Sequence, residues 1–259
     1  MPFTLSHAAA ALPFRGTRLI ISAVVVGCFA PDFEYFLELS PHTGFGHSLP
    51  GVFAFDLPAG FALLWLFHRY AKEPLAACLP AGARDRVQVG PKSLSIHSIS
   101  RLGMILLSIL VGVATHILWD SFTHDRYWLF FHWRLLRERV TLPLFGLRPW
   151  YGIFQYISSA LGMAIILIWF LHWYRNTAPL RPRPDRRFLK RDRIALASAF
   201  AIAVAIALIR AVDSGIPDGV HGAQRFMTQG VVTCLAIFWF EVVIYGIVRD
   251  HTRSEVPVA

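Results

Sequence analysis

Three ionisable side chains stand at the end of an apolar segment that begins at Leu102: His116, Asp120 and His124. Because a step of four residues advances an α-helix by about 40°, this spacing places all three along one stripe. An imidazole and a carboxylate one turn apart can bind a divalent cation together, provided that other segments supply further ligands. The stripe therefore predicts part of a metal site.

The N-terminal segment predicts a short helical hairpin that contributes to the same site. Thr4–Leu12 reads as a helix, Pro13 to Gly16 breaks it, and the apolar run Leu19–Ala30 ends at Pro31 and Asp32. Twelve helical residues reach only about 18 Å, short of the roughly 30 Å hydrocarbon core of a bilayer. We therefore expect residues 4–31 to be re-entrant or to lie at the membrane interface. A hairpin returns His7 and Asp32 to the same end.

The composition indicates an all-α, polytopic membrane helix bundle. Hydrophobic residues make up 55% of the 259 residues and charged residues only 16%, with a mean hydropathy of +0.50; soluble domains carry about 25% charged residues. About five spanning helices are expected, at 51–68, 102–119, 150–174, 194–212 and 227–248. The cysteines Cys28, Cys78 and Cys234 are isolated, which favours neither a disulfide framework nor a cysteine-based zinc site.

The regions between the spans complete the predicted organisation. We expect a single integral membrane domain over 1–259, with a metal-site half (2–124), an interfacial aromatic segment (125–149) and accessory spans (150–259). Residues 69–101 read as a linker without regular structure. The aromatic and arginine residues of 120–149 suggest an amphipathic helix in the headgroup region.

The distribution of basic residues predicts the orientation in the membrane. Sixteen Lys and Arg residues lie in 69–101, 175–193 and the C-terminal tail, against six in the segments on the opposite side. The positive-inside rule places the richer side in the cytoplasm and the His/Asp loops on the extracytoplasmic face. The basic run 181–193 reads as an anchor against anionic membrane lipid rather than as a nucleic-acid site, since Phe188 is its one aromatic residue.

Seven donors should then lie near one membrane face: His7, Asp32, Glu34, His47, His116, Asp120 and His124. Each one alone has an ordinary explanation as a helix cap, a polar contact or an interface residue. As a set they indicate function, because ionisable groups at membrane depth are costly. Nitrogen and oxygen donors without cysteine suit zinc, manganese or a similar divalent ion, and Asp120 or Asp32 could bridge two ions. Asp56 could orient His47, or pack beside Pro58.

The order of these motifs resembles a group of bacterial membrane proteins. A His, then Pro-Asp-x-Glu, Gly-His-Ser and His-x-x-x-Asp look like the membrane-bound metal-dependent hydrolases of bacteria, which are related by their ligand pattern to zinc-dependent phospholipase C and the zinc nucleases. Within that group, Pro-Phe-Thr-Leu-Ser-His-Ala-Ala-Ala and Ala-Pro-Asp-Phe-Glu-Tyr-Phe most resemble a bacterial family of unknown function. The resemblance covers residues 2–124.

The resemblance implies a ligand set. His7, Asp32, His47, His116 and Asp120 match the metal-binding positions, and Glu34 falls where the membrane relatives often have a second acid. The soluble phospholipases carry a further His and a later His-x-x-x-Glu, whereas here Glu138 follows His132 by six residues. This departure favours one or two ions over three. His124 has only its spacing to support it as a ligand.

We therefore expect a metal-dependent hydrolase of the bacterial cytoplasmic membrane that acts on a phosphoester. One or two divalent ions, with zinc favoured, would activate water, and Asp32 or Glu34 would accept its proton. The position at the membrane surface favours a lipid or lipid-linked substrate. The alternative is a non-enzymatic membrane protein, either an ion or proton transporter that uses Asp56, Glu241 and Arg210 or a scaffold with a vestigial metal site. The sequence predicts no oligomeric state.

Overall fold

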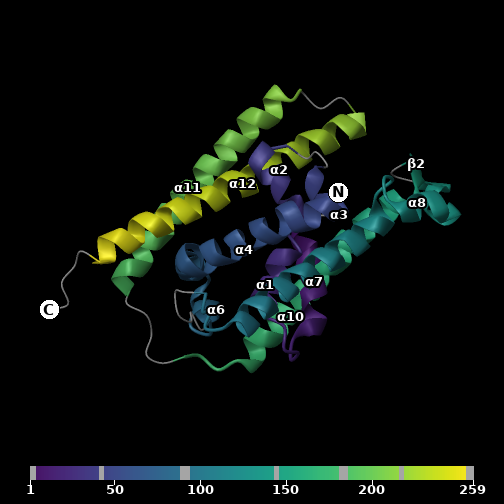
Figure 1. The fold of residues 1–259 in the computed structure, drawn as a ribbon. Helices are drawn as coiled ribbons and strands as arrows, with labels where there is room; N and C mark the ends of the chain where they lie inside the picture. The colour runs from purple at the N-terminus through teal and green to yellow at the C-terminus, as the bar shows by residue number, and fades with distance from the viewer. Residues whose placement is uncertain are drawn as a thin grey trace. The chain divides into compact units, whose positions relative to one another are not determined.

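The computed structural model describes residues 4–40, 44–87, 94–142, 146–180, 186–215 and 219–254 (Figure 1). These residues form helices and one two-stranded antiparallel sheet. The predicted all-α class is therefore confirmed.

The described residues contain five helical stretches that are long and apolar enough to cross a membrane, which confirms the predicted number and fits an integral membrane protein. They are Leu49–Cys78, Ile99–His132, Trp150–Asn176, Leu189–Asp213 and Arg225–Thr252. Each is longer than the apolar core predicted for it, because polar and aromatic flanking residues continue the helix. The first of them includes two π-helical segments, η4 (Val52–Asp56) and η5 (Phe67–Ala71).

The chain divides into two compact units. The first comprises Met1–Phe33, Phe45–Phe61 and Ile96–Trp173, and it contains every expected site residue except Glu34. Its elements are η1 (Thr4–Phe14), α1 (Ile21–Gly27), η2 (Ala30–Asp32), η3 (Phe45–His47), α3 (Leu49–Gly51), η4, α7 (Ile99–Thr123), α8 (Trp128–His132), α9 (Arg134–Arg137), β1 (Arg139–Leu142), β2 (Gly146–Pro149) and most of α10 (Trp150–Asn176).

The N-terminal helical hairpin is present in this unit. The 3-10 helix η1 and the helix α1 pack against each other, and both contact α7. The chain reverses after Pro13 at Gly16, whose φ of +88° is a left-handed conformation that glycine adopts readily. The hairpin therefore brings η1 and the end of α1 to α7, where the His/Asp stripe lies.

Two glycines allow α1 and α7 to pack in direct backbone contact. A Cβ added at Gly27 would lie 2.2 Å from the carbonyl oxygen of Ile109, and one added at Gly112 would lie 2.1 Å from that of Val24. The Ser108 hydroxyl, on the same face of α7, accepts a hydrogen bond of 3.0 Å from the backbone N–H of Ile20. Small residues permit such close helix packing in membrane proteins.

The segment after α7 differs from the prediction. The expected amphipathic helix over 120–149 is wrong: α7 continues to Thr123, the short helices α8 and α9 follow, and then β1 pairs with β2 in the register Arg139↔Pro149 to Leu142↔Gly146. Trp133 is extended between the two helices. The β-branched Val140 and Thr141 favour the strand, and beyond the Arg139↔Pro149 pair the Trp150 N–H donates to the Glu138 carbonyl oxygen at 3.0 Å.

The second unit comprises Glu34–Gly44, Ala62–Ser95 and Tyr174–Ala259. It contains most of α2 (Phe33–Glu38), the second half of α4 (Leu57–Leu66), η5, α5 (Lys72–Cys78), α6 (Ala81–Arg84), α11 (Arg186–Asp213) and α12 (Gly219–Ser254). The helices α11 and α12, green and yellow in Figure 1, lie side by side. The expected lack of structure over 69–101 is wrong for residues 69–84, where η5, α5 and α6 form.

An ionic network explains why that part of the second unit is ordered. Arg249 of α12 donates to Glu73 of α5 at 2.6 Å and to both carboxylate oxygens of Asp192 at 3.0 Å, and the Tyr245 hydroxyl donates to Asp192 at 2.6 Å. Asp192 is only 2% exposed. A buried carboxylate needs such partners, so the network holds α5 against α11 and α12.

Candidate metal centre

Five buried donor residues come together in the first unit. His7 lies on η1, Asp32 on η2 and His47 on η3, while His116 and Asp120 lie one turn apart on α7. Their side chains are between 0% and 5% exposed. Two overlapping groups could each hold a metal ion, His7 with His116 and Asp120, and Asp32 with His47 and His116.

The distances between imidazole nitrogens and carboxylate oxygens are nearly uniform. Asp120 Oδ2 lies 3.4 Å from His116 Nε2 and 3.7 Å from His47 Nε2, and Asp32 Oδ1 lies 3.5 Å from His47 Nε2 and 3.6 Å from His116 Nε2. The other oxygen of Asp120, Oδ1, lies 3.5 Å from His7 Nε2. Four of these donor atoms thus follow one another in a ring, which we call the four-donor ring: His47 Nε2, Asp32 Oδ1, His116 Nε2 and Asp120 Oδ2.

These distances are too long for hydrogen bonds, whose heavy atoms usually lie about 2.7–3.2 Å apart. Both nitrogens of His7, His116 Nε2, Asp32 Oδ1 and Asp120 Oδ1 are buried and have no hydrogen-bond partner among the described residues. Unsatisfied buried polar atoms are costly, and each one in a folded protein calls for an explanation such as an ion. The donor set therefore fits a divalent cation.

A backbone carbonyl fixes the orientation of His116. Its Nδ1 lies 2.8 Å from the carbonyl oxygen of Cys28, at the end of α1. Since a carbonyl only accepts, Nδ1 carries the proton, and the lone pair on Nε2 is free to bind an ion. A metal-binding histidine usually has its second nitrogen held in this way.

Thr4 orients Asp32 in the same manner. The Thr4 hydroxyl donates a hydrogen bond of 2.6 Å to Asp32 Oδ2, which leaves Oδ1 directed at His47 and His116. Thr4 and His7 belong to the same 3-10 helix, so η1 supplies both a donor residue and the residue that positions another donor. A third glycine supports η1, because Gly162 of α10 leaves room for the Ser6 carbonyl beside His7.

The charge states of two donors outside the spanning helices suit metal binding. Burial lowers the pKa of His7 to about 4, so its imidazole is neutral at neutral pH. Burial opposes ionisation of Asp32, but the nearby His116 and His47 and the Thr4 hydroxyl together hold its pKa well below its ordinary value. A neutral imidazole and an ionised carboxylate are the forms that bind a divalent ion.

We expect Thr4→Val to weaken metal binding by roughly 10- to 100-fold, the usual effect of losing a residue that orients a ligand. Valine keeps the shape of threonine but cannot donate to Asp32 Oδ2. Thr4→Ser keeps the hydroxyl and should bind metal within a few-fold of the wild type. Titration of the metal-free protein with Zn²⁺ against a competing chelator measures both affinities. Equal affinities for the valine and serine variants would show that Thr4 does not position Asp32.

The remaining expected site residues are placed less centrally. His124 Nδ1 lies 3.6 Å from Asp120 Oδ2, but His124 belongs to neither of the two donor groups. Glu34 belongs to the second unit and is in neither group, and the missing side chain of Gly44 leaves room for its carboxylate. Asp56 is fully buried in η4, and its carboxylate lies against Gly46, the residue before His47. The roles of His124 and Glu34 stay predictions.

Three parts of the site were missing from the sequence prediction. The Thr4 hydroxyl lies one turn before His7, a spacing that could have suggested it. Trp119, between His116 and Asp120, packs edge-on against the His7 ring with centroids 5.5 Å apart. The Cys28 carbonyl is a backbone group 88 positions away from His116, and the type of residue at position 28 does not predict this contact.

The fold and the donor set define an all-α protein that fits an integral membrane class, with a buried His/Asp group able to hold a metal ion. The chain belongs to the family described as Domain of unknown function (DUF4184), whose model matches residues 1–247. No curated protein and no solved structure matches it.

Proposed function

We propose that this protein binds a divalent metal ion, with zinc preferred, and hydrolyses a phosphoester at the membrane. The observation that carries the proposal is the four-donor ring of His47, Asp32, His116 and Asp120. These buried donors come from three separate elements, and their neighbouring distances are 3.4–3.7 Å.

The spacing of the ring supports a tetrahedral ion. Ligand atoms at about 2.1 Å from a tetrahedral ion lie about 3.4 Å from one another, whereas adjacent ligands of an octahedral ion at that distance lie about 3.0 Å apart. The observed distances agree better with the tetrahedral arrangement, which zinc adopts with histidine and carboxylate ligands. Because Nδ1 of His116 is bonded to the Cys28 carbonyl oxygen, His116 has only Nε2 left and can bind one ion.

A second ion would therefore depend on Asp120 as a bridge. Its Oδ1 lies 3.5 Å from His7 Nε2, while its Oδ2 belongs to the four-donor ring. His7 and Asp120 Oδ1 provide two ligands for a second ion, and His124, near the same carboxylate, is the further donor we propose for it. We propose one principal ion and a weaker second one.

The proposed chemistry follows from the donors. A divalent ion held by these donors would polarise a phosphoryl oxygen and lower the pKa of a water ligand towards about 7. Asp32 or Glu34 would accept the proton from the attacking water, and the two carboxylates remain alternatives for this role. The buried setting of His7 and His116 keeps their imidazole rings directed at the donor set.

The proposed location rests on charge and resemblance. The distribution of Lys and Arg supports an extracytoplasmic position for the His/Asp end, and the motif order resembles the membrane-bound metal-dependent hydrolases of bacteria. That resemblance supports a bacterial cytoplasmic membrane and a lipid or lipid-linked phosphoester as substrate.

The test is hydrolysis by the full-length protein purified in detergent and loaded with Zn²⁺. We expect release of the alcohol from bis(p-nitrophenyl) phosphate or from a phospholipid, loss of activity with a chelator, and recovery when Zn²⁺ is added. Glu34→Gln keeps the side-chain shape but removes a proton acceptor, and Asp32→Asn also removes a charged ligand of the four-donor ring, so both are compared with the wild type at equal metal content. We expect kcat to fall by at least about 100-fold in one of them, within the usual contribution of general acid–base catalysis.

Two other results would support the alternatives. A stoichiometric metal content without turnover of any phosphoester would indicate a scaffold with a vestigial site. A protein that binds no metal would contradict the proposal, and ion or proton flux measured in vesicles would then test transport through Asp56, Glu241 and Arg210.

A further inference from the structure

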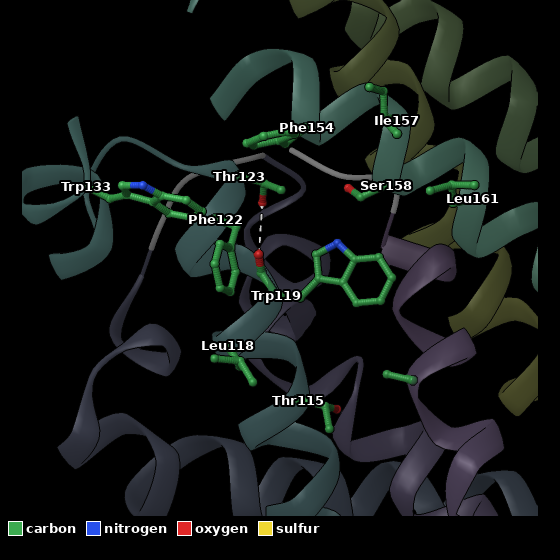
Figure 2. A pocket seen from close by; sticks show the side chains of 11 residues that line it. Thr115, Leu118, Trp119, Phe122, Thr123, Trp133, Phe154, Ile157, Ser158 and Leu161 are labelled. Atoms are coloured by element: carbon green, nitrogen blue, oxygen red, sulfur yellow. Dashed lines mark hydrogen bonds between the residues drawn. The ribbon is translucent and has the colours of Figure 1, made fainter. Parts of the chain in front are cut away.

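An apolar cavity adjoins the candidate metal centre in the first unit. Its volume is about 570 Å³, which is within the usual range of small-molecule pockets. Its walls include Trp119, Phe122 and Thr123 on α7 and Phe154, Ser158 and Leu161 on α10 (Figure 2). Ala10 of η1 also lines it. The surface that these side chains present to the cavity is almost wholly apolar.

Trp119 belongs both to the cavity and to the surroundings of the metal centre. In Figure 2 its indole points from α7 towards the Ser158 and Leu161 side chains of α10. Its ring also packs edge-on against the His7 ring, with centroids 5.5 Å apart. It is also the residue immediately before Asp120. The Trp119 side chain thus contacts both the cavity and the His7 ring.

The indole N–H of Trp119 offers a polar contact at this point. Its Nε1 is buried and has no hydrogen-bond partner among the described residues. A buried tryptophan N–H usually finds an acceptor. An apolar cavity that has one unsatisfied buried donor beside it, next to a metal site, suits a ligand that is apolar along its length and has oxygen atoms at one end.

We propose that this cavity binds a hydrocarbon chain of a membrane phospholipid whose phosphoester reaches the metal centre. The inference rests on the proposed function and names its substrate class. The chain would lie between α7 and α10, and an ester or phosphate oxygen would accept from the Trp119 N–H.

The walls indicate this occupant over a soluble one. Both α7 and α10 belong to stretches long and apolar enough to cross a membrane, so the cavity opens among surfaces suited to lipid chains. Leu161 and Ile157 on its α10 wall are 56% and 48% exposed, as residues in contact with acyl chains would be. A hydrophilic phosphoester would gain nothing from these walls, because they offer it few polar partners.

The first test measures binding without using activity. The full-length protein is placed in nanodiscs of phosphatidylethanolamine and phosphatidylglycerol that contain a phosphatidylglycerol with a diazirine in its acyl chain. After illumination, we expect labelled peptides to include 115–123 and 154–161 at several times the level found on other lipid-facing helices. Ser158→Phe, which adds a ring to the wall, should remove most of this label. Equal labelling of all lipid-facing helices, unchanged by Ser158→Phe, would overturn the proposal.

The second test compares a long substrate with a short one. Ser158→Phe and Leu161→Trp should lower kcat/KM for a long-chain phospholipid by about tenfold or more and leave hydrolysis of bis(p-nitrophenyl) phosphate unchanged. Ala164→Phe is the matched control, since Ala164 is exposed on the same helix and does not line the cavity. Equal activity of wild type and both cavity variants on the phospholipid would overturn the proposal.

The two tests separate the two hypotheses. If no phosphoester is hydrolysed but labelling is concentrated in the cavity and removed by Ser158→Phe, the proposed hydrolysis fails and the lipid site stands. If the short phosphoester is hydrolysed but the label is evenly distributed, the lipid site fails and the hydrolase stands.

Discussion

Replacing His116 with alanine is expected to reduce the metal affinity of the purified protein by more than about 100-fold, the upper end of what loss of a merely orienting residue costs. His116 is the one residue common to both donor groups, and its Nε2 lies 3.4 Å from Asp120 and 3.6 Å from Asp32. Its loss therefore removes a ligand from the four-donor ring and a buried partner from both Asp32 and Asp120. We expect metal content measured by mass spectrometry to fall to background.

His7→Ala should behave differently from His116→Ala. The Nε2 atom of His7 lies 3.5 Å from Asp120 Oδ1, a carboxylate oxygen outside the four-donor ring. We expect this variant to keep the principal ion and to lose only a second, weaker one. A single ion that disappears equally in both variants would instead show that His7 is a ligand of the principal ion.

His132→Ala is the matched control for both. His132 belongs to the same unit but is exposed, and its Nδ1 contacts the carbonyl oxygen of Trp128, 2.8 Å away. It should keep the metal content of the wild type. If the double variant His116→Ala and Asp120→Ala retains its metal while folding normally, the metal centre has been assigned to the wrong residues.

The parts of the fold that the sequence could predict are those that depend on local patterns. Long apolar runs predict the spanning helices, and Pro13 with Gly16 predicts the reversal of the N-terminal hairpin, since both signals act within a few residues. The stripe of His116 and Asp120 on α7 follows from helix geometry alone. The ionisable residues were recognisable because a membrane protein rarely places such groups at depth without a reason.

The remaining features depend on contacts between distant segments. The short helices of 69–87 form where Arg249, far along the chain, pairs with Glu73 and Asp192. No pattern within 69–101 predicts that partner. The strands β1 and β2 depend on pairing with each other rather than on a helical period. The orientation of His116 depends on a backbone carbonyl, and every residue type has one.

The close packing of α1 on α7 also joins segments far apart in the chain, so the sequence alone does not predict it. It leads to the largest effect expected on folding. Gly112→Ala should destabilise the protein by roughly 3 kcal/mol or more, at the upper end of overpacked cores. The added Cβ would lie 2.1 Å from the Val24 carbonyl oxygen and 2.8 Å from the backbone nitrogen of Cys28. Backbone atoms cannot turn aside as the end of a flexible side chain can, so α1 has to move away from α7.

Gly103→Ala is the matched control, because Gly103 lies on the same helix and an added Cβ there would meet nothing within 4 Å. Removing a glycine from a helix interior at an open position should stabilise the protein by about 0.5–1 kcal/mol. Unfolding in mixed micelles with increasing dodecyl sulfate, followed by circular dichroism, compares the two variants. Equal stability of Gly112→Ala and the wild type would show that α1 and α7 are not in backbone contact.

The same substitution should also affect the metal centre, because the displaced backbone carries the Cys28 carbonyl that holds His116 Nδ1 at 2.8 Å. Gly112→Ala protein that remains folded should therefore bind Zn²⁺ about 10- to 100-fold more weakly, as expected when the partner that orients a metal-binding histidine is lost. Gly103→Ala should bind it as the wild type does. A folded Gly112→Ala variant with unchanged metal affinity would show that the contact between α1 and α7 supports the fold but does not position the donor.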